Sequence, residues 1–98
     1  MPRALVLNDL DNVATLIDSG KAGDDCALQG EAKGTVRLLA DVPFGHKVCI
    51  KDTSAGQEIL KYGTIIGKAS AAIKPGAHVH THNVESIRGR GDQAGSSK

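Results

Sequence analysis

Aromatic residues are nearly absent from this sequence, which contains no Trp, one Phe and one Tyr among its 98 residues. Its core must therefore be built from small aliphatic side chains, and the chain is long enough for only one domain. Two aromatic residues also leave no platform on which single-stranded nucleic acid could stack its bases. These absences indicate one small domain of modest stability, which contact with another chain would help to stabilise.

A dominant sign of charge is also missing. The formal net charge is +1, and acidic and basic residues alternate along the chain, so nothing favours binding to nucleic acid or to an anionic membrane. The apolar run at residues 4–7 is too short for a signal peptide or a membrane span. Cys26 and Cys49 match neither a disulfide framework nor a C-x-x-C metal site, which indicates reduced thiols. We therefore expect a cytoplasmic protein.

No uninterrupted amphipathic stretch of helix length follows residue 20, because 12 glycines and 3 prolines punctuate the chain. The sequence predicts an all-β protein, although residues 12–18 could also form a short helix. Residues 20–33 are polar and are interpreted as a loop. We expect one β domain at 1–84 and a disordered polar tail at 85–98. The predicted strands are 4–7, 13–17, 35–39, 47–50, 58–60, 65–69 and 78–81.

One turn pattern recurs three times, at residues 42–48, 53–59 and 73–79. Each copy has an aliphatic or β-branched residue, two spacers, a Gly, two spacers and an aliphatic residue. The Gly predicts a tight turn with positive φ that leads into a strand. Residues 17–20 begin a fourth copy, but Gly23 stands where the closing aliphatic residue is expected, so the pattern predicts three such turns.

Three of the four histidines, His78, His80 and His82, alternate along one predicted strand. Since strand side chains alternate between faces, all three are predicted to project from one side. Neighbouring imidazoles would stand about 7 Å apart at Cα, which allows a pair to hold one divalent ion. We predict ligation by His80 and His82, with Asn83 as a hydrogen-bonding neighbour. His46, a carboxylate or another chain would supply the missing ligands.

The same histidines have other interpretations, as solvated residues of an edge strand or as partners of backbone carbonyls. An imidazole that titrates near neutral pH can also act as a general acid or base. His46 and Lys47, after the turn at Gly45, form a second candidate site, for substrate. Lys61 and Tyr62 form a third, with Lys61 able to meet a carboxylate, although packing and an exposed lysine are the simpler interpretation.

Several motifs follow one another in the order and spacing of a known family. They cover residues 36–83, about half of the chain, and a further match lies at residues 11–14. The motifs are Asp11-Asn12-Val13-Ala14, Gly45-His46-Lys47-Val48, Lys61-Tyr62-Gly63, Ile66-Gly67 and Val79-His80-Thr81-His82-Asn83. Together they resemble the small SAF-type domain of the altronate/galactarate dehydratase family, and the last motif is the most specific.

The resemblance implies a β-clip fold and a metal-assisted dehydration, or related β-elimination, of a hydroxy acid, with Fe(II) or another divalent ion. Residue by residue it covers His80, His82 and Asn83. In that family the small domain is fused to a large catalytic domain or made separately, and sulfolactate sulfo-lyase small subunits are similar. The 98 residues hold no large domain, so the resemblance implies a small subunit that needs a large dehydratase subunit and is inactive alone.

Two other classes of function stay open at this point. One is a module that binds a sugar acid or a metal without turnover, and the other is a structural interaction domain. A homo-oligomer is compatible with each of them. The sequence does not select the acid, nor does it decide whether the leaving group is water or sulfite.

Overall fold

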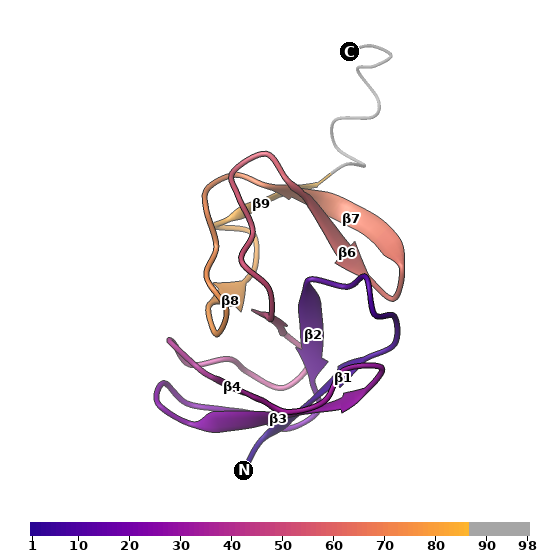
Figure 1. Cartoon of the computed structure of the whole chain (residues 1–98). Coiled ribbons are helices and arrows are strands. Elements are labelled where there is room, and N and C mark those ends of the chain that lie inside the picture. Colours follow the sequence, from indigo (N-terminus) through magenta and orange to yellow (C-terminus); the bar gives the residue numbers. More distant parts are fainter. Residues whose placement is uncertain (87–98) are drawn as a thin grey trace.

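The computed structural model describes residues 1–86, and this part of the chain consists of strands joined by turns without a helix (Figure 1). It therefore includes no helix that could cross a bilayer. This confirms the predicted all-β fold. The strands are β1 Arg3–Val6, β2 Val13–Leu16, β3 Asp25–Gly30, β4 Thr35–Arg37, β5 Lys47–Cys49, β6 Glu58–Lys61, β7 Thr64–Ala69, β8 His78–Val79 and β9 Val84–Ser86.

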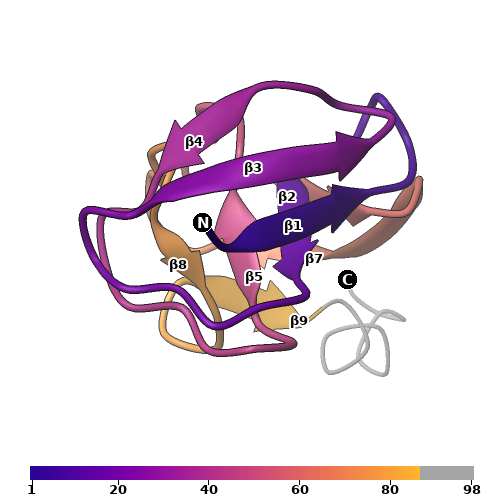
Figure 2. The same cartoon turned by 90° about the horizontal axis from the view of Figure 1, so that it is seen from below.

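The strands form two sheets. The larger has the order β4-β3-β1-β2-β5-β8 and the smaller has the order β6-β7-β9. Neighbouring strands are antiparallel, except that β1 and β3 are parallel. Strong coiling of the larger sheet makes β1 and β3 cross the direction of β2 and β5 (Figure 2). The smaller sheet lies at the opposite end of the molecule from β3 and β4 (Figure 1).

The core consists of two hydrophobic clusters, and strands β2 and β5 each contribute side chains to both. Along β2, Val13 packs in one cluster while Ala14 and Leu16 pack in the other. Along β5, Val48 and Cys49 divide in the same way. Because successive strand residues face opposite sides, one short strand can close two small cores at once. The aliphatic core predicted from the composition is therefore split in two.

The two cysteines are buried free thiols, one in each cluster. Burial is the main cause that raises the pKa of both Cys26 and Cys49. A thiol with a raised pKa stays protonated and is a poor nucleophile near neutral pH. Both residues therefore act in packing.

The three predicted glycine turns are present. Gly45, Gly56 and Gly76 have φ angles of 83°, 85° and 95°. Each turn leads into a strand, respectively β5, β6 and β8. The apolar residue that closes each copy is at most 2% exposed, so the turn tucks it under the chain as expected.

A fourth copy of this turn lies at residues 20–26, three positions later than the candidate rejected from the sequence. Gly23 has a φ of 92°, and the closing residue is the fully buried Cys26. The other copies open with a larger residue, whereas this one opens with Gly20. A Cβ at this position would lie 2.4 Å from Leu38 Cδ1, so only glycine fits without a shift of that side chain. The three predicted turns are thus joined by one that was not predicted, because a buried thiol and a crowded glycine stand where the pattern expects aliphatic residues.

The four turns are joined in pairs by isolated β-bridges. Gly20 and Val42 exchange two backbone hydrogen bonds of 2.9 Å. Thr53 and Ile73 do the same at 3.0 and 2.8 Å. Each bridge uses the residues that open two copies of the pattern, so the same construction occurs twice in the molecule.

Three predicted boundaries need correction. Residues 20–33, predicted as a loop, contain β3. Their polar composition does not indicate a strand, and β3 forms because it pairs with the distant β1. The strand predicted at 78–81 ends at Val79, and a turn follows. The strand β9 continues to Ser86, two residues past the predicted end of the domain at 84. The remainder of the predicted tail, 87–98, lies outside the described residues. Residues 13–16 form a strand and not the alternative helix.

Two buried polar residues before β2 connect the sheets. Asp11 and Asn12 are only 1% and 3% exposed. The Asn12 side chain acts like an additional strand residue along β6: its Nδ2 donates to the Glu58 carbonyl at 2.9 Å, and its Oδ1 accepts from the Leu60 amide at 2.8 Å. We call this pair, Asp11 and Asn12, the inter-sheet clamp.

The Asp11 carboxylate holds the turn between β6 and β7. Its oxygens accept from the amides of Tyr62 and Gly63 at 2.8 and 2.7 Å. Tyr62 has a φ of 56° and is the one non-glycine residue with positive φ in the described chain. Such a conformation costs on the order of 1 kcal/mol or more, which the two charge-assisted hydrogen bonds offset.

The clamp predicts a specific loss of stability. Asp11→Asn should lower the free energy of unfolding by about 1–3 kcal/mol, because the NH₂ of a buried amide side chain would face a backbone N–H in place of an accepting oxygen. Urea unfolding followed by circular dichroism measures the change. Asp52→Asn is the control. The side chains of Asp52 and of its ion-pair partner Lys74 are each 74% exposed, so this substitution should change the free energy of unfolding little. Equal losses in both variants would contradict the role of the clamp.

Candidate functional site

The histidines meet at one edge of the larger sheet. His46 ends the turn before β5, and His78 begins β8, the strand at the edge of the larger sheet. The antiparallel pairing of β5 with β8 sets Val48 opposite His78 and Lys47 opposite Val79. Two segments about 30 residues apart in sequence thus present their histidines to one another.

Three imidazoles form a compact cluster. His46 Nδ1 lies 2.9 Å from His78 Nε2, and the His46 and His80 ring centroids are 4.7 Å apart. The His78 and His80 rings are stacked with their centroids 5.4 Å apart. One nitrogen from each ring lies within 4.8 Å of the other two. We call His46, His78 and His80 the histidine cluster.

His82 and Asn83 occupy the turn after β8 and play different parts. The His82 ring lies 5.7 Å from that of His78 but is outside the group of converging nitrogens. The Asn83 side chain folds back on the backbone, where its Oδ1 accepts from the His80 amide and its Nδ2 donates to the His78 carbonyl, both at 2.9 Å. Asn83 therefore shapes the turn that carries His80.

The surroundings of His78 favour its neutral form. Burial lowers the pKa of His78, and the positive charges of His80, His46, His82 and Lys47 lower it further. A hydrogen bond between His46 and His78 also needs one ring nitrogen without a proton. Neutral imidazole is the form that binds metal ions.

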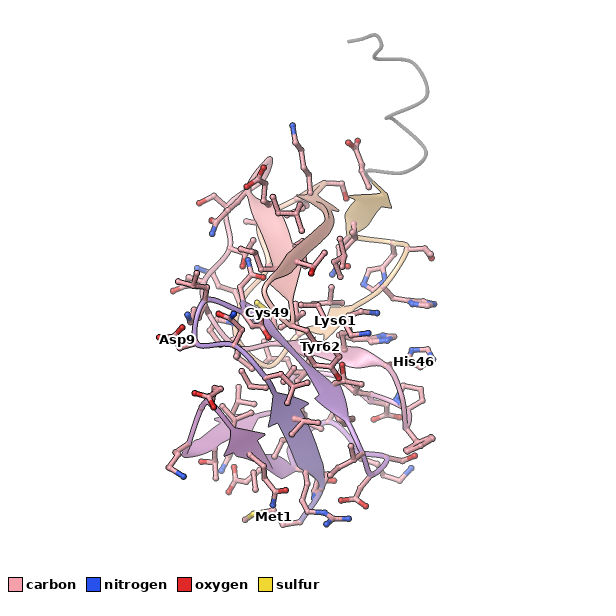
Figure 3. All side chains as sticks on the ribbon, turned by 90° about the vertical axis from the view of Figure 1, so that its right-hand side faces the viewer. Met1, Asp9, His46, Cys49, Lys61 and Tyr62 are labelled. Atoms are coloured by element: carbon pink, nitrogen blue, oxygen red, sulfur yellow. The ribbon has the colours of Figure 1, made fainter. Side chains whose placement is uncertain are left out.

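A groove of about 400 Å³ adjoins the cluster. Residues of both sheets line it, and His80 belongs to the groove as well as to the cluster. Lys47, next to His46 in sequence, is half-buried there. Figure 3 shows Lys61 and Tyr62 near the boundary between the sheets, with His46 farther toward the right-hand edge. The lining residues are Lys47, Lys61, Ile66, Val79, His80, Thr81 and Val84.

The cluster fits a divalent transition metal. Imidazole nitrogens bind such ions at about 2.0–2.1 Å, so nitrogens that share one ion stand roughly 3–4 Å apart. The observed group, within 4.8 Å, needs only small side-chain rotations to reach that spacing. Three protein ligands and open positions are typical of a catalytic site.

A family model described as the altronate/galactarate dehydratase SAF domain matches residues 2–87. The chain belongs to this family. The match confirms the family inferred from the motifs and covers more of the chain than those motifs do.

Three relatives illustrate how the SAF domain is distributed. The altronate dehydratase of Escherichia coli K12 is 39% identical over 77 residues, which are 79% of this chain and 15% of that protein. The galactarate dehydratase (L-threo-forming) of the same organism is 37% identical over 75 residues, 74% of this chain and 13% of that protein. The (2R)-sulfolactate sulfo-lyase subunit alpha of Paracoccus pantotrophus is 47% identical over 49 residues, 50% of this chain and 73% of that protein. The chain therefore spans a small part of the dehydratases and most of the sulfo-lyase subunit.

The structure changes which residues belong together. The sequence predicts that His80 and His82 bind one metal ion together, whereas the structure groups His80 with His46 and His78. The pairing of β5 with β8 that brings His46 in had no local signal. Lys61 also lines the groove, although its sequence context indicated packing first. The His-x-His run was the signal that marked this edge as a site.

The lowered pKa of His78 predicts acid sensitivity. The unfolded chain has the ordinary value of 6.5 and takes up a proton at a higher pH than the folded chain does. Stability present above pH 6.5 should therefore be lost as the pH falls below that value, until the folded His78 is protonated as well. Urea unfolding at about pH 7.5 and about pH 5.5 measures this loss. His78→Gln should show a smaller difference, and an unchanged difference in that variant would contradict the assignment.

Proposed function

We propose that this SAF domain is the small subunit of a hydroxy-acid lyase of the altronate/galactarate dehydratase type and acts with a separate large catalytic subunit. The histidine cluster beside a half-buried lysine is the observation that carries the proposal. Family membership over residues 2–87 supports the reaction type. The 47% identity over 49 residues to a protein named subunit alpha supports the division into two chains.

His46, His78 and His80 would hold a divalent metal ion, for which the family resemblance implies Fe(II). Such an ion, when bound, stabilises negative charge that develops on carboxylate and hydroxyl oxygens. Burial and the neighbouring positive charges lower the pKa of His78, which favours the neutral, metal-binding form of that imidazole. The turn shaped by Asn83 fixes the backbone of His80 and so limits how far the His80 imidazole can move from the other two.

Dehydration of a hydroxy acid removes a proton next to the carboxylate and delivers one to the leaving hydroxyl. His82 is exposed beside the cluster, where its imidazole can act as the general acid or base toward the substrate. Lys47, half-buried in the groove, supplies a positive charge for the substrate carboxylate. His80 and His82 are the proposed catalytic residues, and His46, Lys47 and Asn83 support substrate binding.

A sulfo-lyase is the second candidate function. The chain covers 73% of the Paracoccus sulfo-lyase subunit and is 47% identical to it over the matched residues. The same cluster and lysine would serve an elimination in which sulfite leaves instead of water. Only the substrate separates the two candidates, so one set of assays addresses both.

Reconstitution tests the proposal. The chain would be co-expressed with a large dehydratase chain, and the purified complex assayed with altronate, galactarate and (2R)-sulfolactate. His80→Ala and His82→Ala should each lower kcat/KM by about 10²- to 10⁴-fold. Lys33→Ala, an exposed change between β3 and β4, should leave it unchanged. Full activity of the double histidine variant would refute these roles. Binding of an acid without turnover by any complex would favour a non-catalytic module.

A Co(II) titration distinguishes the three proposed ligands of the histidine cluster from the neighbouring His82. Removal of His46, His78 or His80 by substitution with Ala should weaken Co(II) binding by more than the roughly 10- to 100-fold typical of an outer-sphere partner. His82→Ala should have a smaller effect, since its ring lies outside the converging group. Visible absorption of Co(II) reports both affinity and geometry. Equal losses for His82 and His46 would show that His82 is also a ligand.

A further inference from the structure

Two lysines from different sheets line the same groove. Lys47 lies on β5 of the larger sheet and Lys61 ends β6 of the smaller one. Both are half-buried. Among residues 1–86 the ion pairs are Arg3–Asp18, Arg37–Asp25 and Lys74–Asp52, so neither groove lysine has a carboxylate partner in that part of the chain.

The two ammonium groups disfavour one another. Both lysine side chains line the one groove, so two positive charges converge there. Lys61 Nζ lies 5.0 Å from the centroid of the Tyr62 ring, within the range of a cation–π contact. Like charges held together in a half-buried groove are unfavourable until an anion binds between them.

The position of Lys61 is built into the fold. The register of β6 against β7 shifts between Ile59 and Leu60, and a bulge of this kind redirects the side chains that follow. Immediately after Lys61 the chain enters the strained turn at Tyr62, which the buried Asp11 carboxylate holds. The buried clamp therefore serves to fix the end of β6 over the groove.

We propose that Lys47 and Lys61 form a carboxylate-binding site that anchors the acidic end of a hydroxy acid in the groove, with its hydroxyl-bearing carbons toward His80. The inference deepens the proposed function and rests on it for the class of ligand. Ile66, Val79 and Val84 form the apolar part of the lining and reduce the contact of the ion pair with water, which strengthens it. A volume of about 400 Å³ lies within the range of small-molecule sites.

A titration of the full chain tests the site. Isotope-labelled protein would be titrated with D-galactarate and, in parallel, with galactitol, which has the same carbon skeleton without carboxylates. Galactarate should shift the NMR signals of Lys47, Lys61 and Thr81, and galactitol should not. Lys61→Met and Lys47→Met should each weaken galactarate binding about tenfold or more, the loss expected for a hydrogen bond to a charged group. Lys61→Arg should retain most of the affinity.

The control is Lys33→Met, which removes the same charge from an exposed position between β3 and β4 and should change affinity less than twofold. Equal binding by the Lys61 and Lys33 variants, or no binding of galactarate to the unaltered chain, would overturn the inference.

The metal titration and the lyase assay do not depend on this result. If they succeed while the lysine variants bind normally, the proposed function stands and the anion site fails. If galactarate binds through both lysines but no lyase activity appears with a large subunit, the anion site stands and the catalytic proposal fails.

Discussion

Hydrogen bonds from two buried side chains, Asp11 and Asn12, hold the two sheets in a fixed relation. Within residues 1–86 the sheets share no continuous ladder of backbone hydrogen bonds, so their mutual position depends on these contacts and on the packing around β2 and β5. Buried polar groups of this kind have few alternative partners, which makes the arrangement specific as well as stable. The groove between the sheets keeps its shape because of this clamp.

The candidate site brings together groups that disfavour one another. Imidazoles crowd at the edge of the larger sheet, and two lysines face one groove. The fold compensates with rigid local structures: the glycine turn before His46, the Asn83 turn around His80 and the carboxylate-held turn after Lys61. Residues kept in place against repulsion are ready to receive a ligand of opposite charge or a metal ion, and such arrangements are typical of functional sites.

Local patterns predicted much of the fold. The glycine turns lead into short strands of β-branched and aliphatic residues, and these strands were found close to their predicted positions. The fourth turn and β3 were missed for a common reason. Gly20 and Cys26 serve there as core residues, and β3 is stabilised by parallel pairing with β1, which no neighbouring residue signals.

The sequence by itself determined the all-β class, the turns that require glycine and the edge where three histidines recur at alternate positions. Each of these depends on the conformational preferences of a few adjacent residues. Tertiary structure alone decided that His46 joins His78 and His80, that His82 lies outside their converging nitrogens, and that Lys61 and Lys47 line one groove from different sheets. These contacts depend on strand pairing and on the clamp between distant segments, and the free energy of such long-range contacts is not encoded in any local pattern.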